Sequence, residues 1–189
     1  MTIRNVLMNP TRTGLVAALR LMGASIDEVD AREIGGERVA DLRVRHAALS
    51  AIEVPADLAP SMIDEYPILF VAAAFAKGTT IARGAHELRV KESDRIAAMA
   101  AALGLAGVSL TEHEDGLSIE GRDSEPLPGT GDAYVASLLD HRIAMSMAVA
   151  GMHSSRPIRI DDAAPIATSY PLFVDTALGL GAAPQWSNR

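Results

Sequence analysis

The segment LGLAGV at residues 103–108 closes an apolar helical stretch, and two similar segments occur elsewhere in the chain. They read LRLMGA at residues 19–24 and LGLGAA at residues 178–183, so the copies lie 84 and 75 residues apart. Ten residues before each segment stands a residue type that favours a helix start: Asn9, Ser93 and Thr168. One such ending is only common helix punctuation. Three endings in phase with three helix starts predict an internal duplication.

A second kind of predicted helix also recurs. Asp64 precedes an apolar run at residues 68–76, and Asp140 precedes a similar run at residues 143–150. The two aspartates are 76 residues apart, close to the first period, and aspartate is a residue type that caps helices. Both helices are apolar almost all round, which predicts that they are buried on every side.

Predicted strands fill the intervals between these helices. Eight short segments have the composition of strands: residues 3–8, 25–29, 39–45, 51–54, 80–83, 108–113, 116–120 and 157–160. Asp115-Gly116 predicts a tight hairpin turn. The fold class that follows is α/β (α+β), a pseudo-threefold repeat of β-α-β-α-β-β units within one domain, residues 1–189. A closed threefold arrangement would need one more helix of the second kind.

Composition excludes several functional classes. The chain of 189 residues is 49% hydrophobic and 22% charged, which is typical of a globular domain. Its net charge of -7 argues against nucleic-acid binding. No apolar run reaches the ~18 residues that a membrane span needs, and the first residues lack the apolar core of a signal peptide. Without cysteine or metal-ligand histidine spacing, we expect a cytoplasmic protein with no metal site.

Charged side chains gather at the predicted helix starts, where free N–H groups attract anions. In ELRVKESDR, residues 87–95, Arg95 could hold a phosphate or carboxylate with two parallel hydrogen bonds. Glu92, between Lys91 and Arg95, could act as an acid or base. A solvated helix start with local ion pairs would explain the same segment without any site.

The start of the other helix reads Asp140, His141, Arg142. A cation in a first turn opposes the helix dipole, so Arg142 suits a bound anion there. The alternative is a simple aspartate cap with Arg142 paired elsewhere. Asp64 has the position of a cap, and a cap at the mouth of a pocket can also bind a substrate hydroxyl. No phosphate-binding glycine loop and no serine-hydrolase motif occurs.

Two of these charged segments resemble signatures of the 5-enolpyruvylshikimate-3-phosphate synthases. They are LRVKESDR at residues 88–95 and DHRIAM at residues 140–145. Three more segments are similar to the family: NPTRTG at 9–14, SMIDEYP at 61–67 and IATSYP at 166–171. The resemblance runs from about Asn5 to Gly181 and is strongest to the bacterial, glyphosate-tolerant class II enzymes.

The resemblance implies a fold of two similar domains, each built from three such units, with this chain matching the carboxy-terminal domain. It implies transfer of the enolpyruvyl group of phosphoenolpyruvate to the 5-hydroxyl of shikimate 3-phosphate, without a cofactor. Asp64 would engage that hydroxyl and take its proton, and Glu92 would handle protons at the phosphoenolpyruvate methylene. Lys91, Arg95 and Arg142 would hold the anionic groups, with His141 nearby.

Further family residues that grip the two substrates would lie in an amino-terminal domain that this sequence does not match. We therefore expect this chain alone to be catalytically silent. Glu87 and Thr168 stand where some family members have an asparagine and a lysine that contact ligands, so their roles here stay open. The alternatives are the related UDP-N-acetylglucosamine enolpyruvyl transferase, which usually uses a loop cysteine, and a non-catalytic domain that retains the fold.

Overall fold

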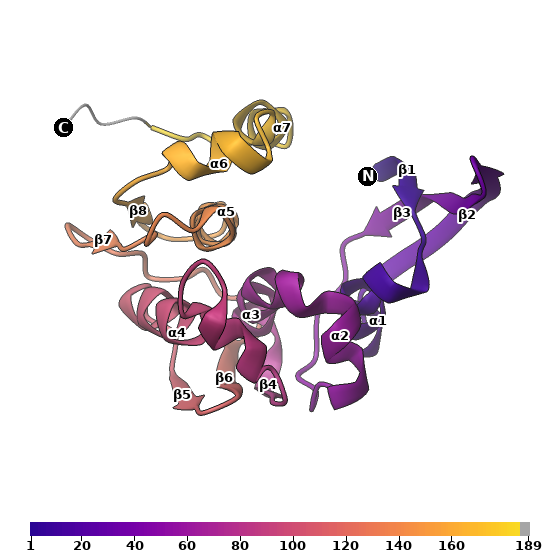
Figure 1. The fold of residues 1–189 in the computed structure, drawn as a ribbon. Coiled ribbons are helices and arrows are strands. Elements are labelled where there is room, and N and C mark those ends of the chain that lie inside the picture. Colours follow the sequence, from indigo (N-terminus) through magenta and orange to yellow (C-terminus); the bar gives the residue numbers. More distant parts are fainter. Residues whose placement is uncertain (186–189) are drawn as a thin grey trace.

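The computed structural model describes residues 1–185 and arranges the strands in small sheets (Figure 1). An antiparallel sheet has the order β1-β3-β2 and contains β1 (Thr2–Leu7), β2 (Ser25–Ile34) and β3 (Glu37–Arg45). A second antiparallel sheet has the order β4-β6-β5 and contains β4 (Lys77–Ala82), β5 (Leu110–His113) and β6 (Gly116–Arg122). The short strands β7 (Tyr134–Val135) and β8 (Arg159–Ile160) pair in parallel.

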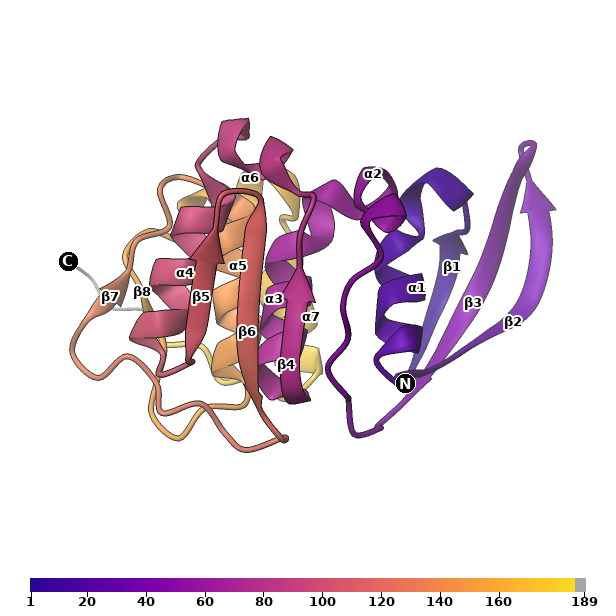
Figure 2. The same ribbon diagram turned by 90° about the horizontal axis from the view of Figure 1, so that it is seen from below.

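The helices pack beside these sheets. They are α1 (Gly14–Leu21), α2 (Ala59–Met62), α3 (Tyr66–Phe75), α4 (Arg95–Leu105), α5 (His141–Gly151), α6 (Ala164–Ser169) and α7 (Phe173–Gly179). Single 3-10 turns are η1 (Pro10–Arg12), η2 (Ala56–Leu58), η3 (Ile63–Glu65) and η4 (His86–Val90). Figure 2 shows the sheet β4-β6-β5 lying across α3, α4 and α5, with α1 and the sheet β1-β3-β2 to one side.

The predicted duplication is visible in the topology. The series β1-α1-β2-β3 and β4-α4-β5-β6 have the same order and the same antiparallel pairing, with the last strand in the middle of each sheet. Around α3, Ser50 and Glu53 form parallel bridges to Lys77 and Ile81 in β4. Around α5, β7 and β8 are likewise parallel. The predicted α/β fold class is therefore confirmed.

The three repeated helix endings share one geometry. Gly23, Gly107 and Gly181 have φ angles of 95°, 93° and 94°, a left-handed conformation that glycine adopts without steric cost. In each copy the residue after this glycine donates its N–H to a carbonyl five residues earlier. This bond satisfies a free carbonyl in the last helical turn.

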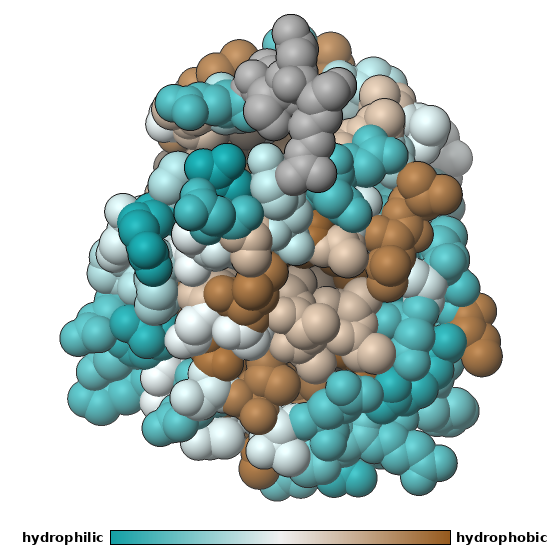
Figure 3. Space-filling view, turned by 90° about the vertical axis from the view of Figure 1, so that its left-hand side faces the viewer, coloured by the Kyte–Doolittle hydropathy of each residue, from teal (hydrophilic) through white to brown (hydrophobic). Residues whose placement is uncertain are grey.

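The core lies between the sheet β4-β6-β5 and the helices α3, α4 and α5. Leu69, Phe70, Ala73 and Ala74 of α3 are all fully buried, but one side of the helix, at residues 68, 72 and 75, is only half-buried, as are residues 145, 148 and 149 of α5. The predicted burial on every side is therefore correct only in part. Burial of a side chain such as Phe70 stabilises the fold by roughly 1.5–3 kcal/mol. On the surface, the face that Figure 3 presents gathers hydrophobic residues near its centre, between hydrophilic margins. No helix within residues 1–185 is long and apolar enough to cross a membrane.

Some predicted boundaries were wrong. Residues 51–54 contain one isolated bridge, at Glu53, rather than a regular strand, and the two-residue strand β7 was not predicted. The helix predicted to begin at Thr168 is instead two short helices, and Thr168 lies inside α6, where its hydroxyl donates to the carbonyl of Pro165 at 2.7 Å. Pro171 lacks an N–H and forces Tyr170 out of the helical conformation, so α6 ends there.

Candidate active site

The amino-terminal ends of α3, α4 and α5 bring the charged residues of distant segments together. Asp64 of η3, just before α3, is the common partner. Its carboxylate lies 3.8 Å from Lys91 Nζ and 3.4 Å from Arg95 Nη1. It also lies 3.6 Å from Arg142 Nη2. The structure thus joins four of the residues predicted for the site, which come from three different helix starts.

The prediction that Asp64 caps a helix was wrong. Glu65 occupies the N-cap position of α3, and no side chain caps that helix. The Asp64 carboxylate instead turns toward the cations, and its backbone carbonyl accepts a hydrogen bond from Arg142 Nη1 at 2.9 Å. Its side chain is 26% exposed, so a ligand can reach it.

A fully buried ion pair underlies this cluster. Arg95 is 1% exposed and Asp140 is 0% exposed, and Arg95 Nε donates to Asp140 Oδ2 at 2.9 Å. Ser93 Oγ donates to the same oxygen at 2.9 Å, and the backbone N–H of Arg142 donates to Oδ1 at 2.9 Å. A buried charge is tolerated when it is paired and hydrogen-bonded in this way.

These bonds determine the charge state of Asp140. Burial alone would raise its pKa, but the hydrogen bonds from Arg95, Ser93 and the Arg142 N–H outweigh burial and lower the pKa below its ordinary value of 3.8. Asp140 therefore stays ionised and, as predicted, caps α5. It also ties the start of α4 to the start of α5, a function that sequence reasoning missed.

The two Nη groups of Arg95 are themselves buried, but they contact the more exposed carboxylates of Asp64 and Glu92. Arg95 Nη2 donates to Glu92 Oε2 at 2.6 Å, and Glu92 is 54% exposed. Lys91 Nζ donates to Glu87 Oε1 at 2.6 Å, and this bond raises the pKa of Lys91 above its ordinary value. Glu87, whose role the sequence left open, is thus a direct partner of Lys91.

The other predicted residues lie at the edges of the cluster. His141 is the first residue of α5, and its half-buried ring makes no hydrogen bond to other parts of residues 1–185. Ser93 was predicted as the cap of α4, but the cap is Asp94, whose carboxylate accepts from the Ala97 N–H at 3.0 Å. Two adjacent residues of capping type give no sequence signal that decides between them.

Sequence reasoning also missed a cation from the first repeat. Arg12 of η1 lies 3.9 Å from Asp64 and 3.5 Å from Glu65. Cations and carboxylates alternate through the cluster, so an incoming anion must draw the cations away from their present partners. Among residues 1–185, no group of three or more acidic or histidine side chains is placed to hold a metal ion.

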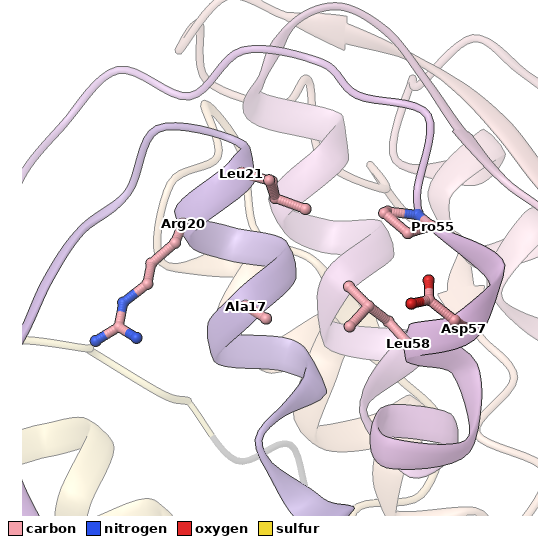
Figure 4. A pocket seen from close by; sticks show the side chains of 6 residues that line it. All are labelled: Ala17, Arg20, Leu21, Pro55, Asp57 and Leu58. Atoms are coloured by element: carbon pink, nitrogen blue, oxygen red, sulfur yellow. The ribbon is translucent and has the colours of Figure 1, made fainter. Parts of the chain in front are cut away.

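A surface hollow between α1 and η2 is separate from this cluster (Figure 4). Its lining residues are Ala17, Arg20, Leu21, Pro55, Asp57 and Leu58. The Arg20 guanidinium turns away from the other labelled side chains and donates to the carbonyl of Ile26 at 3.0 Å. The hollow therefore lacks convergent polar groups, and the charged helix starts are the candidate active site.

Comparison with known proteins defines the family. Residues 1–177 match the family described as EPSP synthase (3-phosphoshikimate 1-carboxyvinyltransferase), and the chain belongs to that family. It is 59% identical over 174 residues to the 3-phosphoshikimate 1-carboxyvinyltransferase of Novosphingobium aromaticivorans, covering 92% of this chain and 40% of that protein. It is 58% identical over 182 residues to the protein of the same name from Rhizobium johnstonii, covering 96% of this chain and 40% of that protein.

A solved structure gives the same result. The chain superposes on an EPSP synthase from Acinetobacter baumannii with a TM-score of 0.90 and 43% identity, covering 94% of this chain and 41% of that one. The chain therefore spans about 40% of the length of the curated relatives that it matches. The family match favours the shikimate enzyme over the UDP-N-acetylglucosamine enolpyruvyl transferase that the sequence left as an alternative.

Proposed function

We propose that this chain provides part of the active site of an enzyme that transfers the enolpyruvyl group of phosphoenolpyruvate to the 5-hydroxyl of shikimate 3-phosphate. This reaction belongs to the shikimate pathway of aromatic amino acid biosynthesis. The observation that carries the proposal is the position of Asp64 among Lys91, Arg95 and Arg142 at three converging helix starts. Such a site suits two anionic substrates and one reacting hydroxyl.

Asp64 and Glu92 are the proposed proton carriers. Asp64 takes the proton of the 5-hydroxyl while the hydroxyl oxygen bonds to the central carbon of phosphoenolpyruvate. Glu92 gives a proton to the methylene carbon of phosphoenolpyruvate. Loss of a proton from the new methyl group and departure of phosphate then restore the double bond. The exposure of Glu92 and the partial exposure of Asp64 support these roles, because both carboxylates can reach a ligand.

The cations are proposed to bind the substrates. Lys91 and Arg142 are partly exposed and can turn from their carboxylate partners toward phosphate or carboxylate groups. The hydrogen bond from Arg95 to the buried Asp140 fixes the position of the Arg95 positive charge. His141, the first residue of α5, lies at the edge of the same charged cluster. Binding of anions by these groups would leave Asp64 free to accept a proton.

The domain organisation is part of the proposal. Residues 1–189 would form one carboxy-terminal enolpyruvyl transferase domain, and an amino-terminal domain would supply the other half of the site. The coverage of about 40% of the relatives supports this arrangement. The cytoplasmic location and the inactivity of the chain by itself stay predictions.

A phosphate-release assay with phosphoenolpyruvate and shikimate 3-phosphate tests the function. The chain would be assayed alone and as a full-length chimera, in which it replaces the matching 40% of the Novosphingobium aromaticivorans relative. We expect turnover by the chimera and none by the chain alone. A chimera that folds and binds both substrates without turnover would contradict the proposal and favour a non-catalytic domain.

A further inference from the structure

The loop between β4 and α4, residues 83–94, carries Lys91 and Glu92, and it lies against the turn that joins β5 to β6. That turn consists of Glu114 and Asp115 and is distant from the loop in sequence. Its contacts with the loop occur at two places, one at the beginning of the loop and one in its middle. The proposed roles of Lys91 and Glu92 depend on how firmly this loop is held.

Asp115 fixes the beginning of the loop. Its carboxylate accepts hydrogen bonds from the Gly84 N–H at 2.8 Å and from Arg83 Nε at 2.5 Å. Its backbone carbonyl accepts from the Ala85 N–H at 2.8 Å. The Gly84 N–H, with Arg83, holds the pKa of Asp115 below its ordinary value. Three consecutive residues of the loop are therefore bound to a single turn residue.

Arg89 fixes the middle of the loop. Its Nε donates to the Glu114 carbonyl at 2.8 Å, and its Nη2 donates to the His113 carbonyl at 2.6 Å. Its Nη1 lies 2.9 Å from Asp94 Oδ2 and 2.9 Å from Glu112 Oε1. The guanidinium thus joins the hairpin, the loop and the residue that caps α4.

The neighbours of Arg89 explain why it acts as the anchor. Leu88 is fully buried in the core, whereas Val90 is 81% exposed, so the loop leaves the core at Arg89. Lys91 and Glu92 follow directly and turn toward Glu87 and Arg95. Residues 90–92 are held by the ion pairs of Lys91 and Glu92, and the Arg89 contacts fix the backbone directly before them.

We propose that Arg89 is a positioning residue, which sets the placement of Lys91 and Glu92 through the β5–β6 turn. This inference rests on the proposed function. Arg89 faces the hairpin rather than the Asp64 cluster, and its planar fork serves two carbonyls and two carboxylates at once. Lysine could not replace it, because an ammonium group lacks this fork.

The test compares two arginine variants in the full-length chimera. Arg89→Gln removes the anchor, and Arg20→Gln is a matched control, because Arg20 also joins a carbonyl and a carboxylate but lies on α1. We expect Arg89→Gln to lower kcat at least about tenfold, because small displacements of reacting groups are costly. The KM for shikimate 3-phosphate should change less than kcat does, because Asp64, Arg95 and Arg142 lie outside the loop and only Lys91 among the proposed binding cations lies within it.

Hydrogen exchange of the chain alone gives a second readout that needs no activity. Arg89→Gln should speed exchange in residues 86–93 and leave the start of α5 unchanged, and Arg20→Gln should change neither. If the parent chimera is inactive, the proposed function fails, and this exchange result still decides the inference. Equal kcat for the two variants, or unchanged exchange in residues 86–93, would overturn it. If Arg89→Gln does not fold, Glu112→Gln, which removes one partner of Arg89, replaces it in both measurements with the same signs.

Discussion

At the scale of single residues, Asp140 holds the helix starts of α4 and α5 together below the surface of the site. It is fully buried, and its two oxygens serve Arg95, Ser93 and the backbone of Arg142. The sequence showed only a helix cap, because the capping pattern is local and Arg95 is 45 residues away. The same holds for Asp64 and Arg142, which are joined across 78 residues. Motifs identified the charged residues, but the pairing between them depends on the tertiary fold.

Replacement of Asp140 by asparagine should destabilise the chain. Asp140→Asn keeps the shape of the side chain but removes the one fully buried carboxylate among the three that pair with the buried Arg95. We expect a loss of roughly 3 kcal/mol in the free energy of unfolding, measured by urea denaturation. Asp123→Asn is the control, because Asp123 forms an exposed ion pair with Lys77 and should change stability by less than about 0.5 kcal/mol. Equal losses of unfolding free energy in the two variants would contradict the claim that the buried Asp140 stabilises the fold more than an exposed ion pair does.

The lowered pKa of Asp140 also predicts an acid transition. Because the pKa in the folded state lies below the unfolded value near 3.8, the contribution to stability is complete above that value. It is lost as the pH falls through the folded-state pKa. The parent chain should therefore lose stability below about pH 4 more steeply than Asp140→Asn. Parallel stability curves for the two proteins between pH 5 and pH 2, measured by urea unfolding, would refute this assignment.

At the scale of elements, the repeated helix endings and most of the burial of α3 followed from sequence, because both have a local cause. The single helix predicted to begin at Thr168 is absent, because Pro171 separates this segment into α6 and α7. The repeat pattern aligned Thr168 with Asn9 and Ser93, but the proline decides the backbone at that point. The strand at residues 51–54 was overestimated for a related reason, because strand pairing depends on a neighbour that composition does not specify.

Two glycines in elements should respond oppositely to alanine. At Gly116, the first residue of β6, an added Cβ would lie 1.9 Å from the carbonyl oxygen of Ala82, so Gly116→Ala should destabilise the sheet by about 2 kcal/mol or more. At Gly104 in α4, an added Cβ meets nothing within 4 Å. Gly104→Ala should therefore stabilise the chain by about 0.5–1 kcal/mol. Thermal unfolding of both variants checks the signs, and two changes of the same sign would contradict this packing.

At the scale of the whole molecule, the helix starts of different repeats converge on one charged cluster. Figure 1 shows α3, α4 and α5 stacked against one another, which places the segments before them side by side. One helix start attracts anions only weakly. Because the chain is duplicated, several helix starts and the cations beside them lie together around Asp64. The chain covers about 40% of its relatives, so the complete site is proposed to need the rest of such a protein.

The most direct test of the account is the turnover of the full-length chimera with Asp64→Asn. Asparagine preserves the size of the side chain but cannot accept the proton of the 5-hydroxyl. Asp57→Asn is the control, because Asp57 is exposed beside the hollow near α1. We predict that Asp64→Asn lowers kcat by about 100-fold or more and that Asp57→Asn leaves it unchanged. An Asp64→Asn chimera that turns over at the parent rate would contradict the central proposal, that Asp64 in the charged cluster accepts the proton of the 5-hydroxyl.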